Sequence, residues 1–172
     1  MSLESNPSIS PPDIVGFGFG GPTFGSSPDF IFGLITTGIV IDFVPLLSEI
    51  KNSPDILQNK SAVFHTFEHL LIHAGNMLAG GISSDVDGIS QPEQNRIIIF
   101  DRSANGGNGA CKSLFLILEE VFKRANEIVN ICNCDDGCPR CIQYYQCSEF
   151  NTNLRKDSVK TLFKIILKDE KF

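Results

Sequence analysis

The sequence predicts a mixed α/β (α+β) domain, in which helices pack on a small sheet. Two apolar segments, Phe30–Phe43 and Arg96–Asp101, have the composition of strands. Three other segments, at residues 61–78, about 111–130 and 154–168, repeat apolar residues with the 3.6-residue period of a helix. A dense cluster of cysteines separates the last two of these helices. We therefore expect a small sheet flanked by helices, with a cysteine-rich connection near the C-terminus.

The N-terminal residues 1–29 are rich in Ser, Pro and Gly. They predict a flexible Gly/Pro/Phe-rich arm whose phenylalanines dock on a partner or on the domain. The glycines of Gly16–Pro22 only superficially resemble a phosphate-binding loop, because no strand is expected before them and no helix after them. We expect one folded domain over residues 30–172.

The first strand region is Phe30–Phe43, which is rich in Ile, Val, Phe and Thr. Two glycines interrupt it, so the sequence predicts either one long strand or two short ones. Pro45–Lys60 should form a short helical turn and a loop, with a break at Ser53-Pro54.

The clearest helix is expected from Ser61, a capping residue, to Leu78. Gly80-Gly81 should end this helix. Its apolar stripe has helical spacing and consists of Val63, Phe67, Leu70, Leu71, Ala74 and Leu78.

The remaining elements alternate between loops and regular structure. Residues 82–95 predict a polar, acidic loop. Arg96–Asp101 is apolar and ends in a carboxylate, which suits a buried central strand. A glycine-rich turn, Asn105–Gly109, should lead into the second helix, from about Cys111 to Asn130. The last amphipathic helix is expected over Leu154–Lys168.

Five of the six cysteines fall within sixteen residues, in the order Cys132, Cys134, Cys138, Cys141 and Cys147. Four thiolates in tetrahedral geometry are preferred ligands of structural zinc. Gly137 and Pro139 can supply the tight turn that directs neighbouring sulfurs to one point. The spacing is too compact for a set of long-range disulfides. The sequence therefore predicts a Zn²⁺ site with five candidates for four positions, with free thiols or a redox pair as the alternative. Cys111 is expected to be a buried thiol.

All three histidines lie on the first helix at four-residue intervals, as His65, His69 and His73. His65, Glu68 and His69 spell the inverted zinc-hydrolase motif, in which two histidines hold zinc and the glutamate handles a proton. Such a site needs a distant third ligand, for which the candidates are Glu119 and Glu120. One hypothesis is therefore a metal-dependent hydrolase or nuclease that uses these three residues and Asp101.

Two non-catalytic hypotheses compete with that motif. The polar residues can buttress the end of the central strand, with Asp101 accepting a hydrogen bond from His69, or they can bind nucleic acid or a partner. Gly106, Cys111, Lys112 and Ser113 also follow the pattern of a phosphate-cradling loop, except that Cys111 stands where glycine is required. We expect a glycine turn that closes the domain there, not an ATP site.

Basic residues are concentrated towards the C-terminus. Residues 1–111 carry four Lys/Arg and eleven Asp/Glu, whereas residues 112–172 carry ten and nine. Any nucleic-acid contact is therefore expected in the C-terminal third. The candidates are Arg140, Arg155 and a column on the last helix made of Lys156, Lys160, Lys164 and Lys168. Such a column can follow phosphates, and the alternative is a solvated helix face.

The N-terminal region has no pattern of a secretory signal. Its longest uncharged apolar stretch, Phe30–Ile41, has about twelve residues, against the ~20 that a membrane span needs. Clustered cysteines without an export signal predict a cytoplasmic protein with reduced thiols, not a membrane protein.

Taken in order, these features resemble the cysteine-rich, zinc-binding C-terminal domain of the mitomycin-repair-type superfamily-two helicases. The resemblance spans roughly residues 30–168, and Asn105 stands where the family usually has proline. The matching pieces are His65-Thr-Phe-Glu68-His69, the strand that ends at Asp101, Gly106-Gly107-Asn-Gly109, the run from Cys132 to Cys141, and Asn153-Leu154-Arg155.

The resemblance implies that Cys132, Cys134, Cys138 and Cys141 are the zinc ligands, with Cys147 as a substitute. It also implies a closed structural site and a role in remodelling DNA or RNA within a complex. We find no helicase motor motifs in this sequence. We therefore expect a non-catalytic subunit of a split helicase in DNA repair or processing, with the motor subunit on a separate chain and DNA bound through the complex. A stand-alone nucleic-acid-binding module is the alternative.

Overall fold

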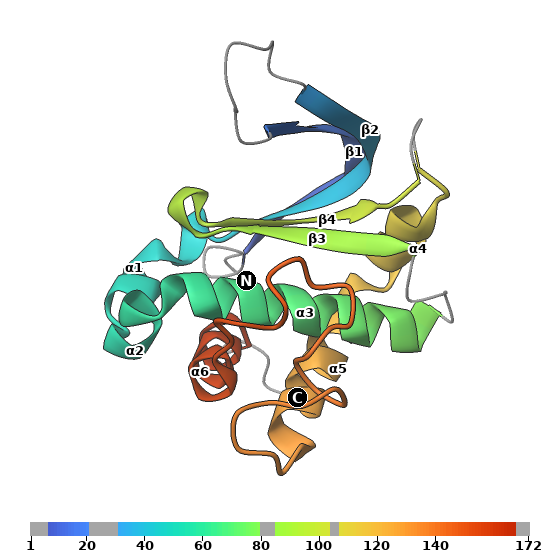
Figure 1. The fold of residues 1–172 in the computed structure, drawn as a ribbon. Helices are drawn as coiled ribbons and strands as arrows, with labels where there is room; N and C mark the ends of the chain where they lie inside the picture. Colours follow the sequence, from blue (N-terminus) through green and yellow to red (C-terminus); the bar gives the residue numbers. More distant parts are fainter. Residues whose placement is uncertain (1–6, 21–30, 80–84, 104–106, 168–172) are drawn as a thin grey trace, which may run out of the picture.

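The computed structural model describes residues 7–20, 31–79, 85–103 and 107–167 (Figure 1). These residues form a four-stranded antiparallel sheet in the order β1-β2-β4-β3. The strands are β1 (Ser8–Gly20), β2 (Ile31–Asp42), β3 (Val86–Gln91) and β4 (Arg96–Asp101). The helices are α1 (Leu47–Lys51), α2 (Pro54–Gln58), α3 (Lys60–Ala79), α4 (Ala110–Leu116), α5 (Leu118–Ile131) and α6 (Lys156–Ile166), and 3-10 turns lie at Val44–Leu46 and Pro92–Gln94.

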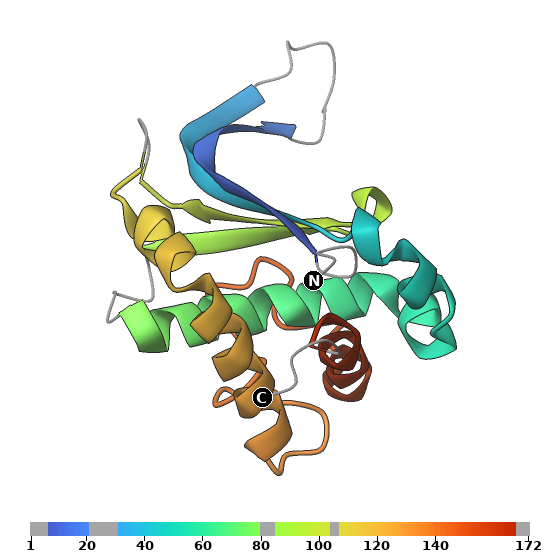
Figure 2. The same ribbon diagram turned by 180° about the vertical axis from the view of Figure 1, so that it is seen from behind.

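Helix α3 separates the sheet from the other long helices. It runs along one face of the sheet, and α5 and α6 lie on its far side in both views (Figures 1 and 2). Thirteen residues of α3 are buried, more than a one-sided apolar stripe contains, because the helix is covered from two sides. The predicted α/β fold class is confirmed.

Phenylalanine rings join these layers at Phe67 of α3. Its ring centroid lies 5.7 Å from that of Phe43, 5.6 Å from that of Phe122 and 4.8 Å from that of Phe163. Phe43 follows β2, Phe122 lies on α5 and Phe163 on α6, so a single buried side chain contacts three separate parts of the fold. Aromatic pairs at these distances add to the stabilisation from burial.

The central strand was predicted correctly. β4 pairs with β2 on one side, where Ile39 faces Ile99, and with β3 on the other. Ile97 and Ile99 are buried in the core, and Ile98 and Phe100 are also buried, which explains the continuous apolar run. β2 is one long strand, the first of the two alternatives.

Both edge strands were missed. Ser8–Gly20 forms β1, where the sequence predicted a flexible arm. Pro11 and Pro12 lie where the register shifts, between Ser10 and Asp13, and such an irregularity in an edge strand tolerates proline because no ladder N–H is needed. The rest of the predicted arm, residues 1–6 and 21–29, lies outside the described residues.

The predicted acidic loop over residues 82–95 was wrong for Val86–Gln91, which forms β3. Only Val86 of this strand is buried, so its polar residues are those of a half-exposed edge strand. A turn that ends at Asn95 in the left-handed conformation (φ 55°) joins it to β4.

The helix boundaries differ from the predicted ones in three places. α3 begins at Lys60, directly after α2, so Ser61 lies inside the helix and does not cap it. The helix expected from Cys111 to Asn130 is two helices, α4 and α5, which are separated at Ile117 (φ −118°, ψ 22°). The last helix, α6, begins two residues later than expected, and both Lys168 and Gly80-Gly81 lie outside the described residues.

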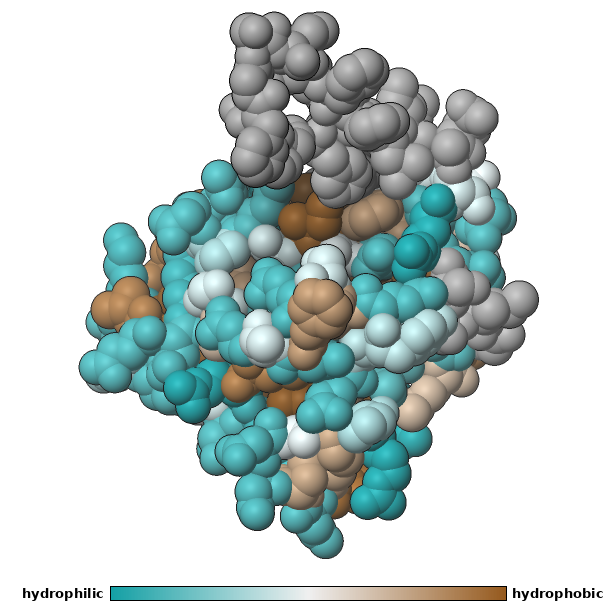
Figure 3. All heavy atoms as spheres, in the orientation of Figure 1, coloured by the Kyte–Doolittle hydropathy of each residue, from teal (hydrophilic) through white to brown (hydrophobic). Residues whose placement is uncertain are grey.

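Among the residues that the structure describes, each helix is too short or too polar to cross a membrane. The face drawn in Figure 3 is mostly hydrophilic where residues are described, and its hydrophobic side chains stand singly or in small groups.

Candidate metal centre

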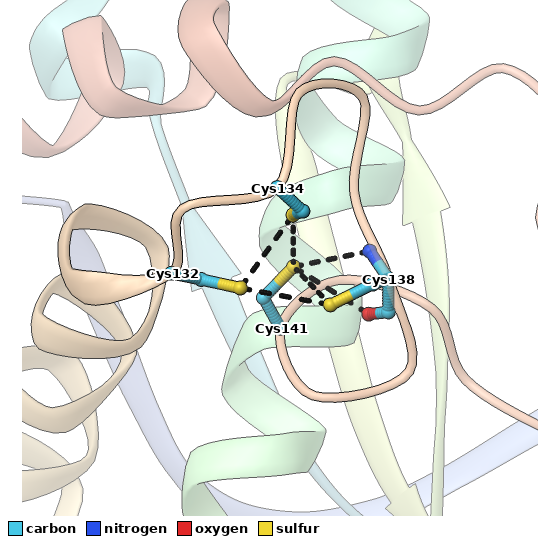
Figure 4. A group of neighbouring side chains, drawn as sticks. All are labelled: Cys132, Cys134, Cys138 and Cys141. Atoms are coloured by element: carbon cyan, nitrogen blue, oxygen red, sulfur yellow. Dashed lines mark hydrogen bonds between the residues drawn. The ribbon is translucent and has the colours of Figure 1, made fainter.

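Four cysteine sulfurs converge in the connection between α5 and α6 (Figure 4). The Sγ atom of Cys132 lies 3.5 Å from that of Cys134 and 3.6 Å from that of Cys138. The Sγ atom of Cys141 lies 3.4 Å from that of Cys134 and 3.7 Å from that of Cys138. Sulfurs bound tetrahedrally to zinc at about 2.3 Å stand about 3.8 Å apart. The four sulfurs therefore fit around a single zinc ion.

The chain turns tightly inside this group. Cys141 donates its backbone N–H to the Cys138 carbonyl at 2.9 Å, and Cys138 donates its N–H to the Cys141 sulfur at 3.2 Å. Gly137 has φ +107°, and a Cβ there would lie 2.4 Å from the Ile142 side chain, so this position requires glycine. The turn predicted around Gly137 brings the sulfurs together.

The cysteine thiols differ in acidity because their surroundings differ. The backbone N–H of Arg140 lowers the pKa of Cys138 to about 6, so this sulfur is largely a thiolate at neutral pH. Burial raises the pKa of Cys141 to about 12. A thiolate is the form that binds a metal ion, so the lowered pKa of Cys138 favours metal binding.

Lys156, the first residue of α6, belongs to this group and not to a phosphate-binding column. Its Nζ donates to the backbone carbonyls of Cys132 and Cys134 and lies 3.4 Å from the Cys134 sulfur. The residue is only 5% exposed. The regular four-residue spacing of the lysines gave no sign that the first of them faces the cysteines.

The described basic candidates other than Lys156 are not buried. Lys160 pairs with Asp157 at 3.0 Å. Arg140, Arg155 and Lys164 are exposed, and Lys168 lies outside the described residues. Arg140 instead lines a pocket with Arg124 of α5, next to Met77, Ile131 and Cys132. Sequence reasoning missed Arg124, because its partner across the pocket is 16 residues away on a loop.

Cys147 lies apart from the four sulfurs, in a second group with His65 and His69 of α3. Its Sγ is 3.4 Å from His65 Nε2. His69 Nδ1 lies 2.7 Å from the Ile142 carbonyl, and burial lowers the pKa of this histidine to about 4. An imidazole with that pKa is neutral at pH 7, so its Nδ1–H donates to the carbonyl.

Glu68 does not lie with the two histidines of its motif. A Cβ on Gly88 of β3 would lie 2.5 Å from Glu68 Cγ, so this side chain is turned towards the sheet. Burial, and secondarily Asp87, raises the pKa of Glu68 to about 8. The proposed third ligands, Glu119 and Glu120, are exposed on α5 and belong to neither cysteine-containing group of the described residues. The two histidines are instead grouped with Cys147.

Asp101 binds backbone amides, and the predicted hydrogen bond from His69 is not formed. Its carboxylate accepts the N–H of Gly109 at 2.9 Å and the N–H of Cys111 at 2.6 Å. A Cβ at Gly107 (φ +80°) would lie 2.1 Å from Asp101 Oδ2, so the glycine turn closes directly over this carboxylate. These amides at the start of α4 are therefore committed to Asp101 and are not a phosphate cradle.

Comparison with known proteins points to the same part of the chain. Residues 67–142 match the family model described as the MrfA Zn-binding domain. An uncharacterized protein of Methanocaldococcus jannaschii is 29% identical over 110 residues, which cover 59% of this chain and 98% of that protein.

Two solved structures have a similar fold. The crystal structure of the helicase MrfA bound to DNA matches 96% of this chain with a TM-score of 0.65 at 15% identity, and the structure with DNA and AMPPNP matches 95% with a TM-score of 0.59 at 17% identity. The matches cover 26% and 23% of the helicase chains, so this chain spans about a quarter of their length.

The matched family region ends just after Cys141 and includes all four clustered cysteines. Together with the geometry of the sulfurs, this match supports a zinc-binding domain that is similar to that of MrfA-type helicases, with zinc as its metal. The structural likeness alone, at 15–17% identity, establishes only the shared fold.

Proposed function

We propose that this chain is a non-catalytic zinc-binding subunit of a helicase complex in DNA repair or processing, with the motor on a separate chain. The observation that carries the proposal is the four-sulfur group on a domain of the MrfA type. Four protein ligands fill the coordination shell of zinc and leave no position for a reactive water. The ion would supply structural rigidity there and no chemistry.

The cysteine cluster lies between the end of α5 and the start of α6. α5 ends at Ile131, one residue before the first sulfur ligand, and α6 begins at Lys156, whose ammonium group is held by the carbonyls of Cys132 and Cys134. Both helices pack on α3. The cysteine cluster thus fixes the ends of two helices relative to each other and makes this side of the domain a rigid surface for a motor subunit.

DNA contact would be made beside the cluster, by a surface that we call the arginine pocket: Met77, Arg124, Ile128, Ile131, Cys132, Asn133 and Arg140. The guanidinium groups of Arg124, which pairs with Glu127 at 2.9 Å, and of Arg140 can bind phosphates. Met77 also lines a neighbouring pocket with Tyr145, whose exposed ring can stack on a base. The net charge of −6 favours such a confined contact over extended wrapping by nucleic acid.

Copurification at native expression level and physiological salt tests the assembly. We expect a helicase motor chain to accompany the protein, and the ATP-dependent unwinding by that motor to increase when the zinc-loaded chain is added. Cys138→Ser should abolish the increase, whereas Cys111→Ser, which changes a buried thiol far along the sequence from the cluster, should preserve it. A motor whose unwinding is the same with and without the chain would contradict the proposal.

The arginine pocket has its own test. Replacing Arg124 and Arg140 together by glutamine should lower the slope of log affinity against log salt for duplex DNA by about 1.8, since each phosphate contact contributes about 0.9. Lys164→Gln, which removes a positive charge from the exposed face of α6, is the control variant. Tight DNA binding by the chain alone would favour the stand-alone nucleic-acid-binding module.

A cytoplasmic location is part of the proposal, because the cysteine cluster needs reduced thiols.

A further inference from the structure

Three side chains outside the four-sulfur group bring metal-ligand atoms to one point. His65 and His69 lie one turn apart on α3, with ring centroids 4.4 Å apart, and Cys147 lies in the loop that precedes α6. One ligand atom from each residue lies within 4.8 Å of the others. Both histidines are buried, with 5% and 2% of their surface exposed.

The two imidazole rings are oriented as in metal sites. The Nδ1 of His69 donates to the Ile142 carbonyl at 2.7 Å, which leaves Nε2 as the nitrogen with a free lone pair. His65 presents Nε2 to the Cys147 sulfur at 3.4 Å, while its Nδ1 lies 3.6 Å from a carboxylate oxygen of Glu149. Histidines that bind metal through one nitrogen typically direct the other to a carbonyl or carboxylate.

The sulfur is held in place by its own loop. The Cys147 Sγ accepts the backbone N–H of Asn151 at 3.3 Å, and the Cys147 N–H donates to the Tyr144 carbonyl at 3.2 Å. The Asn151 side chain spans the same loop through Tyr144 N at 2.6 Å and Tyr144 O at 2.9 Å. These contacts fix the thiol opposite the histidine pair.

One polar atom in this arrangement lacks a hydrogen bond. His65 Nδ1 is buried and has no hydrogen-bond partner, although the carboxylate of Glu149 is near. A cation bound at Nε2 would make the Nδ1–H more acidic and draw that carboxylate into a hydrogen bond.

We propose that His65, His69 and Cys147 form a second metal site, separate from the four-cysteine site, for a divalent ion of the zinc class. Two imidazole nitrogens and one thiolate suit Zn²⁺ or Co²⁺ and disfavour Mg²⁺ and Ca²⁺, which take oxygen ligands. Three protein ligands leave the fourth position to a water or another small ligand. Glu149 orients His65 from outside the coordination shell.

A thiol–imidazole–carboxylate relay of Cys147, His65 and Glu149 explains the same contacts less completely. Such a relay gives no role to His69, which offers a ligand atom within 4.8 Å of those of the other two residues. The metal site uses all three residues.

Metal counting on the full chain tests the second site. The protein would be stripped, loaded with Zn²⁺ or Co²⁺ under reducing conditions and examined by native mass spectrometry. We expect two ions in the wild type and one in both Cys147→Ser and His69→Asn. His73→Asn, one turn further along α3, and Cys111→Ser are the matched controls and should keep two.

The Co²⁺ spectrum assigns the ion that is lost. In Cys147→Ser the thiolate-to-cobalt bands of the four-sulfur site should remain while a second set of bands disappears, and the unchanged first set shows that the variant is folded. One ion in the wild type, or two ions in Cys147→Ser and His69→Asn, would overturn the second site. Neither result affects the proposed helicase role, which rests on the four-sulfur group alone.

Discussion

Replacing Lys156 by methionine separates its structural role from a role in DNA binding. Methionine retains most of the apolar stem but removes the ammonium group that contacts the Cys132 and Cys134 carbonyls and the Cys134 sulfur. Zinc with four thiolates carries a net charge of about −2, so the nearby ammonium stabilises the loaded site. The variant should therefore bind zinc more weakly and should be less stable.

The contacts set the size of both effects. A hydrogen bond to a charged group contributes about 1.5–3 kcal/mol, and two are lost together, partly offset by water reaching the carbonyls. We expect a loss of about 3 kcal/mol in the unfolding free energy of the zinc-loaded protein. Loss of a contact just outside the coordination shell typically weakens metal binding by about 10- to 100-fold.

The assay is competition for zinc with a chromophoric chelator, together with urea denaturation. Lys164→Met is the matched control, because Lys164 is exposed on the same helix, and it should change the unfolding free energy by less than about 0.5 kcal/mol. If Lys156→Met matches Lys164→Met in zinc affinity and in stability, Lys156 does not support the cysteine cluster and our account of this residue is wrong.

Two further substitutions test how β3, β4 and α4 are held. In Asp101→Asn, an amide donor replaces the oxygen that accepts the N–H of Gly109 or Cys111. This variant should lower the unfolding free energy, measured by urea denaturation, by about 2–4 kcal/mol. The exposed Asp136→Asn should leave the unfolding free energy unchanged. Equal stability of these two variants would contradict the role given to Asp101. Gly88→Ala places a Cβ 2.5 Å from Glu68 Cγ, and this clash should lower the unfolding free energy by about 1–3 kcal/mol. In a double-mutant cycle, the loss of unfolding free energy caused by Gly88→Ala should largely vanish when Glu68 is replaced by alanine. If the loss persists in the Glu68→Ala background, contact with Glu68 is not its cause.

The sequence predicted the elements whose pattern is local and strong. The central strand β4 is apolar from Ile97 to Phe100 because it is buried between two neighbours, and α3 shows a clear helical period. The cysteine cluster could be recognised because its ligands lie within ten residues of one another. In each case neighbouring residues in the chain carry the whole signal.

The edge strands could not be predicted because they share little with a buried strand. β1 contains two prolines, which a central strand excludes, and they are tolerated because one of its sides has no partner strand among the described residues. β3 is half-exposed and polar, so its composition is that of a loop. Their pairing depends on the tertiary structure.

The same limit applies to the sites. Cys147 and His65 are 82 positions apart, and nothing in the spacing of the cysteines indicates that the fifth one joins the histidines. The motif of His65, Glu68 and His69 does not act as one unit, because the two histidines face the cysteine loop while Glu68 faces the sheet. Lys156 was assigned to a solvent-facing column of α6, because periodicity does not show that the cysteine loop covers the first turn of this helix.

Zinc X-ray absorption on the full chain loaded with a single equivalent of zinc tests the central claim most directly. The account predicts a first shell of four sulfurs at about 2.3 Å, since the four clustered thiolates take up the first ion. It also predicts that Cys147→Ser leaves this shell unchanged. A shell that contains nitrogen or oxygen at one equivalent, or a reduced protein that takes up no zinc, would contradict it.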